Sequence, residues 1–253
     1  MTGTPDGVLP VDKPLGWTSF DVVAVARRSL GAKRVGHGGT LDPLATGLLP
    51  LLVGPATKFA DRLHTASKVY AALVTFGSET TTDDREGAVT RGAAPPDLTL
   101  EELDLALAPF RGELAQVPPA FAAVKVDGER AYALARRGVT VELSARTVFV
   151  ERLAIASWDA PGLRLLVVCS TGTYIRSLAR DIGRAVGSAA HLGGLRRLAV
   201  GALTVEDAIG IEGLRGGTGP ALLRPADDRI LALADRFREA PAAELLSSWG
   251  RST

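Results

Sequence analysis

The sequence predicts an α/β or α+β domain organised around a mixed β-sheet. Capped helical patterns alternate with β-rich segments, and the strand candidates are mostly joined by short hairpins. One strand candidate, Leu163–Cys169, is apolar at nearly every position, as expected for a central strand buried on both faces. The 253 residues, 46% hydrophobic and 23% charged, suffice for a substantial core.

The N-terminal part predicts a strand, a helix and a glycine-rich loop. Val8–Val11 is a short β-type run. A helix is expected over Thr18–Leu30, because Thr18 can cap it, Asp21 occupies the capping-box position and Gly31 ends it. The glycine-rich stretch follows this helix.

The next part predicts helix, strand, loop and helix. Ala56–Ala66 is expected to be helical and Lys68–Phe76 to be a strand. Thr80–Gly87 has the composition of a polar, acidic loop. Thr99–Phe110 is expected to be a helix, in which Thr99 and Glu102 form a second capping box.

The second half predicts a basic loop, a hairpin and a helix. Lys125–Arg137 is expected to be mobile or rich in loops. Arg146–Trp158 is expected to pair with Leu163–Cys169 through a Pro161-Gly162 turn. A helix with one apolar face is expected to begin at Thr173.

The C-terminal part predicts one more strand, Leu195–Leu203, and a final amphipathic helix around Ile230–Arg238. Residues 1–207 are expected to form the main domain. The remaining 46 residues, 208–253, fall below the usual domain minimum of about 50, so a short or truncated appendage is expected there.

The composition excludes several classes of protein. A single cysteine, Cys169, excludes an intrachain disulfide framework and a thiolate zinc cluster. The three histidines have no metal-ligand spacing, and without asparagine there is no N-glycosylation acceptor. The polar N-terminus lacks a secretory signal, and the longest uncharged stretch, Pro43–Thr57, is too short to span a membrane. We therefore expect a cytoplasmic protein without membrane contact.

The formal net charge of +1 speaks against a nucleic-acid partner, but the charges are segregated. Residues 111–200 carry 13 basic and 7 acidic groups, whereas residues 61–110 carry 4 and 9. Arg176, Arg180 and Arg184 recur on the face of the predicted helix opposite its apolar residues. Such a basic stripe is typical of a nucleic-acid footprint, and a merely solvated helix face explains it equally well.

Common catalytic motifs are absent from the sequence. It contains no phosphate-binding P-loop, dinucleotide fingerprint, zinc-hydrolase pair or serine-hydrolase elbow. What remains is the glycine-rich segment Gly36–Phe59, in which Asp42 precedes Pro43. A carboxylate on such a loop can act as nucleophile, base or metal ligand, but from the dipeptide alone a helix N-cap followed by proline is favoured.

Two more residues stand out. Tyr70 lies in the predicted strand, where tyrosine usually packs with its hydroxyl in water. Arg176 falls in the first turn of the predicted helix, where the helix dipole disfavours a cation. It therefore needs a carboxylate partner or an anionic ligand.

Together these segments resemble the TruB family of tRNA pseudouridine synthases. Gly36–Gly47 is similar to the active-site signature of that family, and the other motifs follow its order along the chain. They are Val11–Pro14 with Gly16–Ser19, Lys68–Tyr70, Gly172–Arg176 and Leu195–Leu198. The resemblance extends from about Val8 to Ala208.

The resemblance implies a pseudouridine-synthase fold with a largely antiparallel sheet flanked by helices. It implies isomerisation of uridine to pseudouridine at position 55, in the T-loop of tRNA, without cofactor or metal. Asp42 would be the nucleophile, Tyr70 would pack against the flipped base and could abstract the proton, and Arg176 would pair with Asp42. The enzyme is expected to act as a monomer.

The resemblance also assigns residues that bind RNA. His37 would help the RNA to open, and Tyr174 and Leu195 would line the uracil pocket. Lys13 matches a lysine of the N-terminal motif. A mobile, thumb-like loop at about residues 111–140 would close over the RNA, with cations suited to phosphate contacts. These cations are Lys125, Arg130, Arg136 and Arg137.

The sequence departs from the family pattern at several places. Where members often read His-Thr-Gly-Ala, this chain has His37-Gly38-Gly39-Thr40. Phe121 replaces a tyrosine of the thumb-like loop, which removes a hydroxyl. The family also commonly carries a C-terminal RNA-binding domain, which residues 208–253 are too few to form, so we expect weaker binding away from the T-loop.

Two alternative functions remain. A non-catalytic tRNA-binding or tRNA-folding chaperone of the same fold would not need Asp42, Tyr70 and Arg176 together. A glycosidase-like hydrolase would usually need a second carboxylate beside the first, and the motif offers none.

Overall fold

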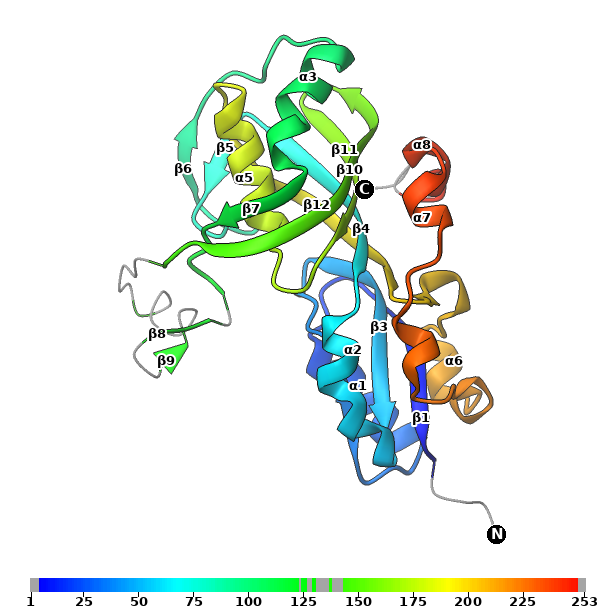
Figure 1. Cartoon of the computed structure of the whole chain (residues 1–253). Helices are drawn as coiled ribbons and strands as arrows, with labels where there is room; N and C mark the ends of the chain where they lie inside the picture. Colours follow the sequence, from blue (N-terminus) through cyan, green and yellow to red (C-terminus); the bar gives the residue numbers. More distant parts are fainter. Residues whose placement is uncertain (1–4, 123, 127–128, 131–136, 138–142, 250–253) are drawn as a thin grey trace. The chain divides into compact units, whose positions relative to one another are not determined.

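The computed structural model describes residues 5–122, 124–126, 129–130, 137 and 143–249 (Figure 1). The chain divides into two compact units. Unit 1 consists of Met1–Ala71 and Leu195–Ala240, and unit 2 of Ala72–Gly194 and Pro241–Thr253. The boundaries fall within two strands, β4 (Lys68–Phe76) and β12 (Ala190–Val200).

Unit 1 is built on β3 (Ala45–Val53), a strand that the sequence did not predict. β1 (Gly7–Lys13) pairs antiparallel with β3 along its whole length, and β2 (Val35–His37) pairs antiparallel with its C-terminal end. β12 runs parallel to the start of β3, with Leu195 opposite Ala45. The short β13 (Leu203–Thr204) pairs with β12. The apolar β3 is buried at almost every position, which is why it lacks an alternating pattern.

The helices of unit 1 cover this sheet. α1 (Ser19–Ser29) has the predicted capping box, because Thr18 and Asp21 bond reciprocally. The segment after β3 is helical as expected, as η1 (Gly54–Phe59) followed by α2 (Ala60–Thr65). The remaining short helices are η3 (Val205–Asp207), α6 (Ile211–Arg215), η4 (Gly219–Leu222), η5 (Asp228–Leu231) and α7 (Arg236–Glu239).

The prediction of a separate appendage from residue 208 does not match the packing. Ile209, Ile211 and Leu214 belong to the same hydrophobic core as β1 and α1. The main chain of Ile209 bonds to Pro10 and Asp12 of β1. The single helix expected around Ile230–Arg238 is also wrong, since η5 and α7 are separate short helices with Ala232 between them in extended conformation.

Unit 2 contains the other part of the sheet, in the order β12-β4-β11-β10-β7. β10 (Arg146–Asp159) and β11 (Gly162–Cys169) form the predicted hairpin, and β11 is buried along most of its length. β10 also pairs antiparallel with β7 (Gly112–Gln116). Two small hairpins are β5 (Ser78–Thr80) with β6 (Val89–Gly92), and β8 (Lys125–Val126) with β9 (Glu129–Arg130).

Two helices of unit 2, α3 (Leu100–Leu107) and α5 (Ile175–Ala185), lie where the sequence predicts helices, whereas α8 (Ala242–Leu245) was not predicted. α3 has the second capping box and continues into η2 (Ala108–Phe110). α5 packs against α3, and α8 packs against β10 and β11. The predicted fold class is confirmed: antiparallel pairs such as β1 with β3, together with the parallel pair of β3 and β12, make a mixed sheet flanked by helices. In the described part of the chain, no helix is long and apolar enough to cross a membrane.

Candidate active site

Asp42 lies in a tight turn immediately before β3. Pro43 and Leu44 form the turn, and the Asp42 carbonyl accepts a hydrogen bond from the Ala45 amide at 3.0 Å. The N-cap interpretation is therefore wrong, because a strand and not a helix follows Pro43. The side chain of Asp42 is partly exposed, as a reactive group requires.

Lys13 holds this turn from within the core. Its side chain is fully buried, and its Nζ donates to the carbonyls of Pro14 (3.0 Å), Trp17 (2.7 Å) and Pro43 (3.4 Å). Burial lowers the pKa of Lys13 from 10.5 to about 8, an effect that the charge of Asp42 partly opposes. This placement argues against the predicted contact of Lys13 with RNA and supports a role in positioning the Asp42 turn.

Three further hydrogen bonds hold the chain on both sides of Asp42. The buried hydroxyl of Ser19 accepts from the Leu41 amide at 2.9 Å and donates to the Leu41 carbonyl at 3.2 Å. On the other side, the Gly16 amide donates to the Pro43 carbonyl at 2.8 Å. The main chain next to Asp42 is thus anchored at Leu41 and at Pro43.

Arg197 anchors the glycine-rich loop, a role that the sequence did not reveal. Its side chain is only 1% exposed. It donates to the carbonyls of Leu48 (2.7 Å), Gly39 (3.0 Å) and Thr40 (3.4 Å). Gly47 lies against it with φ of +98°, and any side chain there would overlap the Arg197 main chain. The consecutive residues Arg196 and Arg197 in the Leu195–Leu198 motif were the only sequence signal of this role. A charged residue in a strand beside the active-site segment needs a polar partner.

Tyr70 and Leu195 pack on the hydrophobic core of unit 1. Both are partly buried and pack on the hydrophobic cluster that contains Leu41 and Ala45. Next to Leu195, Arg196 forms a forked ion pair with Asp12, at 2.7 and 3.0 Å. Asp42, Tyr70 and Leu195 therefore all belong to unit 1, and their assembly into one site stays a prediction.

His37 ends β2 in a half-buried position. Its Nδ1 is buried and has no hydrogen-bond partner among the described residues. Burial, followed by the positive charge of Arg197, lowers the pKa of His37, which keeps the imidazole neutral at physiological pH. Its ring meets that of Phe20 edge to face, with centroids 5.6 Å apart.

Unit 2 holds Tyr174 and Arg176 at the start of α5. The Gln116 side chain clamps the main chain of Tyr174, donating to its carbonyl at 3.1 Å and accepting from its amide at 2.8 Å. Arg176 is 7% exposed and donates to the carbonyls of Thr82 and Phe121, both at 3.1 Å. The buried carboxylate of Asp84 lies 3.8 Å from Arg176. Asp42 belongs to the other unit, so its pairing with Arg176 stays a prediction.

The arginine stripe of α5 is largely occupied by carboxylates, contrary to both sequence interpretations. Arg180 is 9% exposed and binds the buried Asp83 at 2.7 Å. Arg184 binds Glu79 at 2.6 Å, and the Glu79 carboxylate also binds Arg91 at 2.8 Å. The stripe therefore joins α5 to the acidic segment of unit 2, and the segregated charges of the sequence partly neutralise each other.

The residues of the thumb-like loop lie mostly outside the described part. Arg136 is not described, and only the main chain of Lys125 is, in β8. Arg137 is exposed and forms an ion pair with Glu129. Their contacts with RNA stay predictions.

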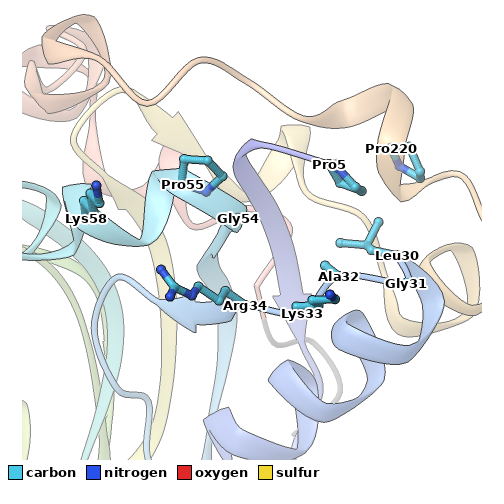
Figure 2. A pocket seen from close by; sticks show the side chains of 10 residues that line it. All are labelled: Pro5, Leu30, Gly31, Ala32, Lys33, Arg34, Gly54, Pro55, Lys58 and Pro220. Carbon is cyan, nitrogen blue, oxygen red and sulfur yellow. The ribbon is translucent and has the colours of Figure 1, made fainter. Parts of the chain in front are cut away.

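Unit 1 also carries a basic pocket of about 750 Å³ away from the elements of the Asp42 turn (Figure 2). Three of its lining side chains are cations, and none is acidic. They are Lys33, Arg34 and Lys58.

The described residues contain no group of three or more His, Cys, Asp or Glu side chains that could hold a metal ion.

Comparisons with known proteins identify the family of this chain. The family model for TruB family pseudouridylate synthases (N terminal domain) matches residues 27–175. Proteins named tRNA pseudouridine synthase B from Ralstonia nicotianae and Gloeobacter violaceus are 48% and 45% identical to this chain. These alignments cover 90% and 86% of this chain and 74% and 77% of the relatives.

Solved structures show the same fold. A chain from the crystal structure of a Cbf5-Nop10-Gar1 complex has a TM-score of 0.70 and 28% identity. A chain from a structure of an H/ACA RNP bound to a substrate RNA containing 2'-deoxyuridine has a TM-score of 0.63 and 26% identity. The two structural alignments cover 88% and 92% of this chain. They cover only 61% of the length of each of the two solved chains. With a family model over more than half of its length and relatives at nearly 50% identity, the chain belongs to the TruB family of pseudouridylate synthases.

Proposed function

We propose that this protein isomerises uridine to pseudouridine at position 55, in the T-loop of tRNA. The observation that carries the proposal is the Asp42 turn, which Lys13 anchors at Pro43 and Ser19 anchors at Leu41, while Arg197 holds the glycine-rich loop before it. Family membership supports the reaction, and the relatives named tRNA pseudouridine synthase B support tRNA as the substrate. We further propose that the enzyme acts as a monomer in the cytoplasm.

The chemistry follows from the residues. A uridine in a stacked loop is inaccessible, so the base is flipped out at a cost of a few kcal/mol. Asp42 acts as the nucleophile that allows the bond between C1′ and N1 to break. The uracil rotates and a bond forms between C1′ and C5, after which the C5 proton is removed and N1 carries a proton. The product is an isomer, so the mass of the RNA is unchanged.

The remaining residues position the base and the nucleophile. Tyr70 packs against the flipped uracil and is the proposed base for the C5 proton, and Leu195 adds an apolar wall. Arg176 is the proposed ion-pair partner of Asp42. Tyr174 lines the pocket, in a position that the Gln116 clamp fixes.

One assay separates this function from its alternatives. Unmodified T-arm stem-loop RNA is incubated with the protein, and pseudouridine is mapped chemically. We expect conversion at one loop uridine without a mass change, and loss of conversion in Asp42→Asn. Binding without conversion by the wild type would support a chaperone, and release of uracil would support a hydrolase.

A further inference from the structure

An exposed aromatic side chain stands beside the Asp42 turn and has no role in the reaction described above. Phe20 lies in the first turn of α1 and is 73% exposed. Its neighbour Ser19 bonds to both main-chain groups of Leu41, one residue before Asp42. The capping box of α1 fixes the same turn of the helix. Phe20 is therefore held in a defined place, close in the structure to the proposed nucleophile.

A second exposed apolar side chain adjoins the other anchor of the turn. Leu15 is 53% exposed, and its neighbour Gly16 donates to the Pro43 carbonyl. The segment that holds the Asp42 turn thus presents apolar groups to solvent next to both of its anchors. A single exposed apolar residue needs no explanation, but two beside a reactive carboxylate indicate a contact surface.

The ring of Phe20 has one aromatic contact, with His37. The two rings are 5.6 Å apart at an interplanar angle of 78°. The lowered pKa of His37 leaves its ring uncharged at neutral pH. Two neutral rings offer no attraction to a phosphate, whereas they suit the π-face of a nucleobase.

We propose that Phe20, supported by His37, forms a stacking site for an unpaired nucleobase of the RNA beside the Asp42 turn. The proposal rests on the proposed function, because flipping a uridine leaves its loop neighbours without a stacking partner. An aromatic ring in a fixed position replaces part of the lost stacking. The site would therefore stabilise the opened loop rather than the reacting uracil.

The test combines protein variants with RNA variants. Binding and single-turnover conversion are measured for wild type, Phe20→Ala, Phe20→Leu and Phe20→Trp on a T-arm stem-loop. Phe20→Ala and Phe20→Leu are expected to weaken RNA binding roughly tenfold, and Phe20→Trp to retain it. Each unpaired loop nucleotide other than the target is then replaced in turn by an abasic one. On one of these RNAs, wild type and Phe20→Ala should bind equally, because the base that stacks is missing.

Controls keep the result specific. Leu105→Ala removes a similarly exposed apolar side chain, 69% exposed on α3, and should bind RNA like the wild type. Thermal denaturation checks that the Phe20 variants stay folded. Equal binding by Phe20→Ala and wild type on the complete RNA would overturn the proposal, as would a Phe20→Ala defect that persists on every abasic RNA. Failure of the wild type to convert any RNA would instead refute the proposed function.

Discussion

Arg197 shows how one buried side chain can set the position of a catalytic loop. Its guanidinium satisfies three carbonyls of a segment rich in glycine, which has little intrinsic order. Charged groups are rarely buried unless their donors are satisfied, and here they are satisfied by backbone instead of a carboxylate. The free-energy cost of burying the Arg197 guanidinium is thus offset by three hydrogen bonds, which also fix the conformation of the loop.

Replacing Arg197 by lysine tests this role. Lysine keeps the charge but cannot reach three carbonyls in a fork. We expect Arg197→Lys to lose at least about 2 kcal/mol of the free energy of unfolding and to lower kcat. Urea denaturation and single-turnover conversion check both effects. Unchanged kcat in a folded variant would contradict a positioning role.

Gly38 explains how the chain accommodates its departure from the family pattern. A Cβ at this position would lie 2.5 Å from Cδ2 of Leu63, so Leu63 of α2 occupies the space that a larger residue would need. We expect Gly38→Thr alone to destabilise the protein by about 1–3 kcal/mol. Leu63→Ala should lose stability on its own yet relieve part of the Gly38→Thr defect. Additive effects in a double-mutant cycle, measured by urea denaturation, would refute this coupling.

The lowered pKa of Lys13 makes stability depend on pH. Between pH 8 and 10.5 the folded protein has released the Lys13 proton while the unfolded chain still holds it, so stability from this residue rises with pH. The free energy of unfolding of the wild type, relative to that of Lys13→Met, should therefore increase by up to about 3 kcal/mol between pH 8 and pH 10.5. Urea denaturation at several pH values measures it. Parallel curves for the two proteins would argue against a shifted Lys13.

At the scale of elements, α5 and the acidic segment form one ion-paired assembly. Arg180→Met leaves the buried Asp83 carboxylate without this partner, which costs about 3–5 kcal/mol, whereas after Asp83→Asn the guanidinium still pairs with Asp181 at 2.9 Å. Removing both charges costs less than removing Arg180 alone. We expect Arg180→Met and Asp83→Asn each to lower the midpoint of urea denaturation, and the double variant to recover part of the loss. Independent, additive losses would show that the pair is not coupled.

The elements that the sequence predicted are those determined by local interactions. The capping boxes of α1 and α3 involve residues three positions apart, and the hairpin of β10 and β11 closes through a two-residue connection. β3 escaped prediction because an apolar strand buried on both faces has no period, and Gly47 and Pro50 interrupt its apolar run. The sequence predicted η5 and α7 as one helix. The helical spacing of apolar residues continues across the extended segment that separates them.

The candidate site was predicted only as far as its motifs extend. Motifs in the sequence pointed to Asp42, Tyr70 and Leu195, all of which belong to unit 1. They could not show that Asp84 lies beside Arg176 or that Gln116 clamps Tyr174, because both contacts join residues far apart in the sequence, 58 positions in the case of Gln116 and Tyr174. They also could not distinguish a cation that faces RNA from one buried against backbone, as Lys13 illustrates.

At the scale of the whole molecule, several of the cations and carboxylates behind the net charge of +1 pair with each other, as Arg180, Arg184 and Arg196 do. A neutral total limits non-specific attraction to nucleic acid, so RNA binding must depend on local groups of unpaired cations. The pocket lined by Lys33, Arg34 and Lys58 is such a group, with three cations and no carboxylate in its lining (Figure 2).

We therefore expect this pocket to bind phosphates of the tRNA. Lys58→Glu should weaken binding of full-length tRNA by about tenfold and lower the slope of log affinity against log salt by about one. Single-turnover conversion at saturating tRNA should be retained, because Lys58 is not part of the Asp42 turn. Arg229→Glu changes the net charge equally but removes a cation already paired with Asp227, so it should have little effect. If both reversals weaken binding to the same extent, the total charge of the protein, and not this pocket, governs its attraction to RNA.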